Sequence, residues 1–401
     1  MAEKKNNCIA CGSSITYPIY NPGEHPLSVM YLPKSSAEAK SVMRFPMNFE
    51  ACGDCGHIYN TEFDYSKIPY AEGSNLMFNK GTGWKVFIDE QIDQLNKKFG
   101  LAGKTIIEIG CGDAHYLKSI KEKFPTARCV GFEPGIEASN AASGGVEAIS
   151  DYFIADRDLP KFKPDFLICR HVLEHLDSPK NFVKEIAYWC NIHEVYPVFL
   201  GEVPCINKAI KHTRINDYLF EHVSNFTDYS FKNMFQLAGY KVLECKTGYG
   251  DEVVVALSVP RVNKRVKKIR ASAAKYHEGI LKQKENVLKK LYELKKSGKK
   301  IAFWGGTGKG TSFLNGLDVN ADDFPTVIDS DHKKCGFFVP GTGQEIRPPE
   351  YLLEVPHEVI VINTQWRAKD IYAEIVRRGI KFEKAFVLLN KKLVEYKGEQ
   401  I

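Results

Sequence analysis

The segment that most constrains the fold of this chain is Thr105–Ala114, in which an apolar strand runs into a Gly-Cys-Gly turn and then a helix. Glycine permits a sharp turn at the carboxyl end of a buried strand, and it leaves room for a ligand to approach the backbone. Further strand-like runs at Cys129–Phe132, Phe166–Cys169 and Val198–Val203 alternate with helical runs. This rhythm predicts an α/β fold in which a parallel sheet is connected by right-handed crossovers.

The ligand expected at this turn carries no phosphate. A dinucleotide-binding turn would read Gly-x-Gly-x-x-Gly, but His115 stands where the third glycine would be. Glu108, near the end of the strand, suits a ligand with an ammonium group, and Glu133, at the end of the next strand, can accept both hydroxyls of a ribose. S-adenosylmethionine (SAM) has both features. The predicted cofactor-binding residues at this turn are Glu108, Gly110, Gly112, Glu133 and Pro134.

Four of the eleven cysteines form two Cys-x-x-Cys pairs, Cys8 with Cys11 and Cys52 with Cys55. Two such pairs can supply the four thiolates of a tetrahedral zinc site. Because four protein ligands leave no open coordination position, the expected Zn²⁺ is structural. Four unrelated cysteines are the alternative. A redox pair is disfavoured, since no thioredoxin-like strand precedes either pair.

A second α/β rhythm begins near residue 300. A strand at Ile301–Trp304 leads into the glycine-rich turn Gly305–Gly310, and further strands are expected at Thr326–Ile328 and Val359–Asn363. The turn is similar to a phosphate-binding P-loop, but that motif needs Ser or Thr directly after Gly-Lys, where this chain has a glycine. An NTPase is therefore excluded.

These features together resemble the nucleotide-sugar C-methyltransferases over nearly the whole chain. The Glu-x-Gly-x-Gly turn, Glu133 and Arg170–Leu176 resemble the core of class I SAM-dependent methyltransferases. The other markers are Phe45–Cys55, Gly201–Pro204, Glu221–Phe226, Gly305–Gly310, Val327–Asp329 and Gly336–Gly341. The resemblance implies methyl transfer from SAM to C3 of a 4-keto deoxysugar linked to a nucleoside diphosphate.

The resemblance also implies the catalytic residues. His222 would be the base that removes the proton next to the ketone, because histidine titrates near neutrality, and Glu221 would orient it. Arg170 and His171 would lie beside the donor and the substrate, whereas His175 is interpreted as a helix-start residue.

The chain departs from the family at two places near this base. Leu219 stands where the family usually has a tyrosine, and so does Asn225. Either Tyr218 replaces the missing hydroxyl, or the site accepts a different substrate.

The expected organisation has four parts: a Cys₄ zinc-binding domain with a helical extension at 1–95, a SAM-dependent methyltransferase core at 96–260, a linking helix at 261–299, and a Rossmann-like nucleotide-sugar-binding domain at 300–401. With neither a membrane-length apolar run nor an apolar signal core, we expect a cytoplasmic protein without a membrane partner. The zinc region does not interleave basic and aromatic residues, so no nucleic acid is expected. The expected partner is a nucleoside-diphosphate sugar, and the chain is expected to be a monomer or a homodimer.

Two other functions stay open. One is methylation of an oxygen or nitrogen on a nucleotide-linked sugar or related metabolite, which needs no ketone. The other is a non-catalytic binding protein with a zinc module and a degenerate SAM fold, which the intact Glu108, Gly110, Gly112 and Glu133 disfavour.

Overall fold

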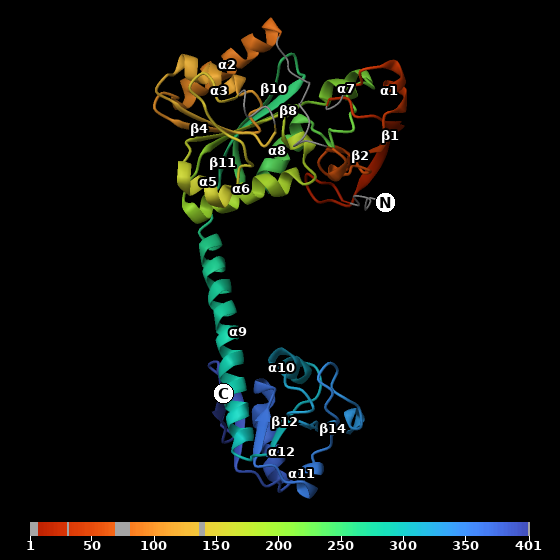
Figure 1. Cartoon of the computed structure of the whole chain (residues 1–401), viewed down its shortest axis with the longest axis vertical. Coiled ribbons are helices and arrows are strands. Elements are labelled where there is room, and N and C mark those ends of the chain that lie inside the picture. The colour runs from red at the N-terminus through yellow and green to blue at the C-terminus, as the bar shows by residue number, and fades with distance from the viewer. Residues whose placement is uncertain (1–6, 30–31, 69–80, 136–140, 400–401) are drawn as a thin grey trace. The chain divides into compact units, whose positions relative to one another are not determined.

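The computed structural model describes residues 7–29, 32–68, 81–135 and 141–399. The chain forms two compact units, 1–267 and 268–401, which are described separately (Figure 1). Among the helices of these residues, none has the length and apolarity needed to cross a membrane.

The first unit begins with a four-stranded antiparallel sheet in the order β1-β2-β3-β9. Its strands are β1 (Thr16–His25), β2 (Phe45–Cys52), β3 (Ile58–Asn60) and β9 (Ser224–Asn225), and the short helix α1 (Ser36–Ser41) precedes β2. Strand β9 comes from a distant part of the chain, and it begins two residues after His222. The sheet therefore anchors the segment that carries the expected base.

The central sheet has seven strands in the order β10-β11-β8-β7-β4-β5-β6. The parallel strands are β4 (Thr105–Ile109), β5 (Arg128–Phe132), β6 (Glu147–Ile149), β7 (Phe166–Arg170) and β8 (Val198–Pro204). The antiparallel strands are β10 (Tyr240–Gly248) and β11 (Val253–Pro260). The predicted α/β, Rossmann-like fold is confirmed.

Helices cover both faces of this sheet. Side chains of α2 (Thr82–Phe99) and α3 (His115–Lys123) pack on one face against Ile106, Ile168 and Leu200. The opposite face is covered by α5 (Ala155–Phe162), α6 (Pro179–His193) and α8 (Asp228–Leu237). The short helix α7 (Asn207–His212) follows β8. The cysteine cluster shares the core on this second face, so the cysteine-bearing N-terminal segment packs on the central sheet within one unit.

The second unit is a six-stranded sheet in the order β14-β13-β12-β15-β16-β17. Its strands are β12 (Ile301–Trp304), β13 (Thr326–Ile328), β14 (Ile346–Arg347), β15 (Val359–Ile362), β16 (Lys384–Leu389) and β17 (Lys392–Glu395). The last residues of α9 (Arg265–Lys296) and helix α10 (Lys309–Leu317) pack on one face. Helices α11 (Tyr351–Glu354) and α12 (Ala368–Arg377) pack on the other.

Candidate active site

The turn after β4 has the backbone shape that its glycines predicted. Gly110 and Gly112 have φ values of 67° and 53°, in the left-handed region that glycine adopts without strain. A Cβ atom on Gly110 would lie 2.5 Å from Cγ2 of Val172. The turn therefore needs a glycine at this position both for its conformation and for the close approach of the chain after β7.

Glu133 is fixed beside this turn by two backbone groups. The N–H of Gly112 donates to its Oε2 at 3.0 Å, and the N–H of Gly135 donates to its Oε1 at 2.8 Å. Both oxygens are thus held at the carboxyl ends of adjacent parallel strands, where ligands of such sheets bind. This position fits a carboxylate that accepts the two hydroxyls of a ribose.

Glu108 is buried at the end of β4 with an unused acceptor. Burial raises the pKa of its carboxyl to about 8, although Arg170 attracts the charge and opposes the change. Nη1 of Arg170 lies 3.7 Å from Oε1, while Oε2 has no hydrogen-bond partner among the described residues. A cationic ligand at this oxygen would favour the ionised carboxylate, so the residue fits the ammonium group of SAM.

Arg170 ties Glu108 to a second buried carboxylate, Glu202, on β8. Nε of Arg170 donates to Oε1 of Glu202 at 3.0 Å, and the guanidinium also lies over the ring of Tyr116. Burial alone would raise the pKa of Glu202. The charges of Arg170 and His171 outweigh burial and lower this pKa to about 2. Sequence reasoning missed Glu202 as a site residue, although it lies inside the Gly201–Pro204 marker.

His171 is held between two carboxylates. Its Nε2 lies 3.1 Å from Oε1 of Glu202, and its Nδ1 lies 3.5 Å from Oε1 of Glu174. Burial disfavours the charged ring, but these two partners together outweigh burial and raise the pKa of His171 to about 9. The ring is therefore protonated near neutral pH, which suits a group that stabilises negative charge and not a base.

His222 has the opposite electrostatic environment. Its side chain is buried and packs edge-on against the ring of His175, with the ring centroids 4.8 Å apart. Burial, and then the charge of His175, lower the pKa of His222 to about 3. The ring is therefore neutral near pH 7, as a base must be, but it is a weaker base than the near-neutral histidine that the sequence suggested.

His175 is the second residue that sequence reasoning missed, since it was interpreted as a helix-start residue. It lies in a short 3₁₀ turn after β7, and its Nδ1 is 2.8 Å from the carbonyl oxygen of Glu221. Donor atoms of Glu174, His175 and His222 all lie within 4.8 Å of one another. The sequence did place His175 four residues after His171 and close to the end of β7. This spacing alone could not indicate a site residue, because it also occurs wherever two residues lie on one face of a helix.

Glu221 connects the segment that carries His222 to the N-terminal part of the chain. Its buried carboxylate accepts the backbone N–H groups of Ser28 at 2.5 Å and of Val29 at 2.8 Å. This ties the residue before His222 to the loop after β1. The structure thus gives Glu221 a role in holding the loop, and its expected orientation of the His222 ring stays a prediction.

Tyr218 and Asn225 lie on the side of the N-terminal sheet. The ring of Tyr218 packs against Tyr20 and Phe49, with centroid distances of 5.1 and 4.6 Å. Asn225 is buried in β9, and its amide nitrogen has no hydrogen-bond partner among the described residues. Tyr218 is therefore an aromatic packing residue in this structure, and its expected catalytic hydroxyl stays a prediction.

The four paired cysteines come together as the spacing predicted. Sγ of Cys8 lies 3.7 Å from that of Cys55, and Sγ of Cys11 lies 3.5 Å from that of Cys52. A tetrahedral zinc ion with Zn–S bonds of about 2.3 Å places its sulfurs about 3.8 Å apart. Each pair is presented by a tight turn, in which Gly12 N–H bonds to Cys8 O and Gly56 N–H bonds to Cys52 O. The arrangement fits a four-thiolate metal ion.

The second unit has its own cavity at the carboxyl ends of β12, β13 and β15. It measures about 190 Å³, and its lining includes Trp304, Lys309, Asp329, Lys334, Trp366 and Arg367. The backbone N–H of Gly306 donates to Oδ2 of Asp329 at 3.2 Å. Lys334 is paired with Asp329 at 3.4 Å, whereas the glycine turn, the helix N-terminus and the cations Lys309 and Arg367 suit an anionic ligand.

Two family models match this chain. A model described as a methyltransferase domain matches residues 84–245, and a model described as a C-methyltransferase C-terminal domain matches residues 262–388. No curated protein matches the chain.

The chain is also similar to solved structures at low sequence identity, and these include two methyltransferases. Magnesium protoporphyrin IX methyltransferase of Synechocystis PCC 6803 with bound SAH is 13% identical, with 45% of this chain and 84% of that chain covered and a TM-score of 0.34. A SAM-dependent methyltransferase of Aquifex aeolicus is 16% identical, with 46% of this chain and 100% of that chain covered and a TM-score of 0.34.

Proposed function

We propose that this chain is a SAM-dependent methyltransferase that methylates a carbon atom, C3 of a 4-keto deoxysugar linked to a nucleoside diphosphate. The observation that carries the proposal is the neutral, buried ring of His222 next to a network of charged residues that leads to the glycine turn. A C-methyltransferase C-terminal domain match supports transfer to carbon.

The residues divide the chemistry between them. SAM would be held by the glycine turn, Glu108 and Glu133, and it supplies the methyl group. His222 takes the proton from C3, and the electron pair of the C–H bond moves toward the C4 carbonyl to give an enolate. The C3 carbon then forms a bond to the methyl group while the bond between that methyl and the donor sulfur breaks. His171, as a cation, favours negative charge near the reaction.

Enolate formation can be tested without methyl transfer. In D₂O without SAM, the enzyme is expected to exchange the C3 proton of a dTDP-4-keto-6-deoxysugar for deuterium, and mass spectrometry would detect the gain in mass. His222→Gln should lose this exchange while still binding SAM. Equal exchange in the variant would remove His222 from the mechanism.

The pH dependence follows from the lowered pKa of His222. A base works in its deprotonated form, so acidification reduces kcat/KM only as pH approaches the pKa of that base in the free enzyme. Since that pKa is about 3, we expect kcat/KM for the sugar, measured at saturating SAM so that Glu108 stays ionised, to change less than twofold between pH 7.5 and 5.5. A histidine with an ordinary pKa near 6.5 would give a loss of about tenfold at pH 5.5. SAM binding measured at each pH controls for changes in the donor site.

We also propose that the C-terminal unit binds the nucleoside-diphosphate part of the substrate at its glycine-rich turn. A Cβ atom on Gly310 would lie 2.0 Å from the carbonyl oxygen of Gly305, whereas a Cβ on Gly316, in the same helix, meets nothing within 4 Å.

Gly310→Ala is therefore expected to destabilise this unit by about 3 kcal/mol, which is the upper end of the usual cost of adding atoms to a packed core. It should also abolish dTDP binding. Gly316→Ala, the matched control, should keep dTDP binding and gain up to about 1 kcal/mol, since alanine favours helix. Calorimetric unfolding and dTDP titration measure both effects. Normal dTDP binding by Gly310→Ala would contradict the assignment.

Methylation of an oxygen or nitrogen on a nucleotide-linked sugar is the second candidate. The substitutions at Leu219 and Asn225 favour it, because they remove two hydroxyls that the family places near the ketone. An O- or N-methyl product, with no deuterium exchange at C3, would select this candidate.

A further inference from the structure

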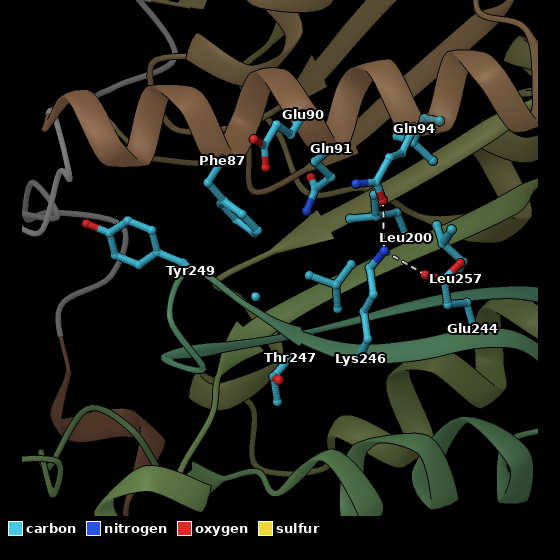
Figure 2. A pocket seen from close by; sticks show the side chains of 13 residues that line it. Phe87, Glu90, Gln91, Gln94, Leu200, Glu244, Lys246, Thr247, Tyr249 and Leu257 are labelled. Atoms are coloured by element: carbon cyan, nitrogen blue, oxygen red, sulfur yellow. Dashed lines mark hydrogen bonds and ion pairs between the residues drawn. The ribbon is translucent and has the colours of Figure 1, made fainter.

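A second cavity lies outside the methyl-transfer residues, on the face of the central sheet that α2 covers. It measures about 330 Å³ and opens between α2 and strands β10 and β11 (Figure 2). Leu200, Val255 and Leu257 contribute from the strands, and Phe87 and Leu95 contribute from the helix. This volume is at the lower end of the range for small-molecule pockets, and its walls are mainly apolar, as such pockets usually are.

One polar side chain, Gln91 of α2, connects this cavity to the charged network. Gln91 is 8% exposed and lines the cavity, and its amide nitrogen donates to Oε2 of Glu202 at 2.7 Å. Glu202 in turn contacts Arg170 and His171. A change at Gln91 therefore acts on the groups that hold Glu108 and His171 in place.

The orientation of the Gln91 amide follows from the charge of its partner. Arg170 and His171 keep Glu202 ionised, and an ionised carboxylate can only accept hydrogen bonds. The NH₂ group must then face Glu202, so the carbonyl oxygen is left on the other side. Among the described residues this buried oxygen has no donor. An unsatisfied buried acceptor costs about 1–3 kcal/mol, which a ligand that donates a hydrogen bond would recover.

Charges at the rim favour a cationic donor. Glu90 and Glu244 line the cavity together with Lys246, and the charge of Glu244 is balanced by its ion pairs with Lys98 and Lys246. Lys246 is already engaged, because its Nζ bonds to Gln94 at 2.8 Å and pairs with Glu244 at 2.7 Å, as the dashed lines in Figure 2 show. The carboxylate of Glu90, exposed on α2, adds negative charge at the same rim.

We propose that this cavity is a second ligand site, which binds a small molecule with an apolar body and an ammonium end that donates to Oε1 of Gln91. Its occupancy is transmitted through Glu202 to the SAM-binding and methyl-transfer residues. The site is independent of the substrate proposed above, since none of the residues assigned to methyl transfer lines it.

The test uses 2-phenylethylamine as the probe, with the full-length protein. We expect saturable binding, with a dissociation constant on the order of 1 mM for a ligand of this size. The carboxylate analogue 3-phenylpropionate should bind at least tenfold more weakly. Saturating 2-phenylethylamine should change the dissociation constant of SAM by at least threefold, measured by calorimetry.

Two variants separate the site from non-specific binding. Val255→Phe places a ring in the cavity and should abolish probe binding, whereas Val259→Phe, on the same strand outside the lining, should not. Gln91→Met should retain weak probe binding but lose its effect on SAM. Absence of saturable binding, equal binding to Val255→Phe, equal affinity for both analogues, or an unchanged SAM affinity would each overturn the proposal. Because every readout is a binding constant, these failures are distinct from a failure of methyl transfer to any sugar.

Discussion

Replacement of His222 by alanine is expected to lower kcat for methyl transfer by about 10²–10⁴-fold, the usual contribution of a general base. The reason is the role proposed for its ring, which burial keeps deprotonated near pH 7 by lowering the pKa of His222 to about 3. SAM affinity should stay within about twofold, because the residues around the glycine turn are unchanged. The measurement is single-turnover methyl transfer together with a SAM titration.

His212→Ala is the matched control for this variant. His212 ends helix α7 and is exposed, so its loss should leave kcat within about twofold. His222→Gln, which keeps a polar side chain of similar length, covers the case in which alanine disturbs packing against His175. A kcat above one-tenth of the unchanged protein in both His222 variants would contradict the role of the base.

Replacement of Cys52 by serine is expected to cause the second large effect, the loss of the metal ion together with the order of the N-terminal sheet. We propose that the ion is Zn²⁺, because four thiolates at these sulfur distances fit its tetrahedral geometry. Structural zinc contributes on the order of 10 kcal/mol of apparent folding free energy in small domains. Because Glu221 is tied to this module through Ser28 and Val29, methyl transfer should also fall by at least tenfold.

Metal analysis and calorimetric unfolding measure this prediction. Because one of the four zinc ligands is lost, the zinc content should fall from about one ion per chain to less than about 0.2 ion per chain. Cys335→Ser, in the second unit, should change neither zinc content nor activity, and Cys11→His should keep the metal because histidine is also a zinc ligand. Full zinc content and unchanged unfolding in Cys52→Ser would exclude a structural metal at this cluster.

The parts of the fold that depend on local sequence could be predicted. The strand at Thr105–Ile109 is β4 as expected, because its apolar run is bounded by Lys104 and by a glycine turn. The apolar positions of Trp84–Lys98 predict a helix there, which is α2, and it ends before Gly100, whose φ of 71° stops a helix. Four cysteines could also be grouped, since each Cys-x-x-Cys pair encodes its own turn.

The parts that depend on distant contacts could not be predicted. Strand β9 has only two residues, and only its pairing with β3 makes it a strand. Helix α5 contains Pro160, which local rules would place at a helix end. The bond from Gln91 to Glu202 joins residues 111 positions apart, and no sequence pattern links them.

The opposite charge states of two site histidines also come from tertiary structure. His171 and His222 have the same intrinsic chemistry, and the sequence favoured His222 as the base only through the family resemblance. Two neighbouring carboxylates raise the pKa of His171 to about 9, whereas burial lowers the pKa of His222 to about 3. Their roles therefore became separable only when their surroundings were known.

The central claim is transfer of a methyl group to carbon. It is tested most directly by incubating the protein with SAM and a dTDP-4-keto-6-deoxysugar and examining the product by NMR. We expect a product with one added methyl group bonded to C3, and no such product from His222→Gln. A methyl group on oxygen or nitrogen, or no methylated sugar from protein that binds SAM, would contradict the claim.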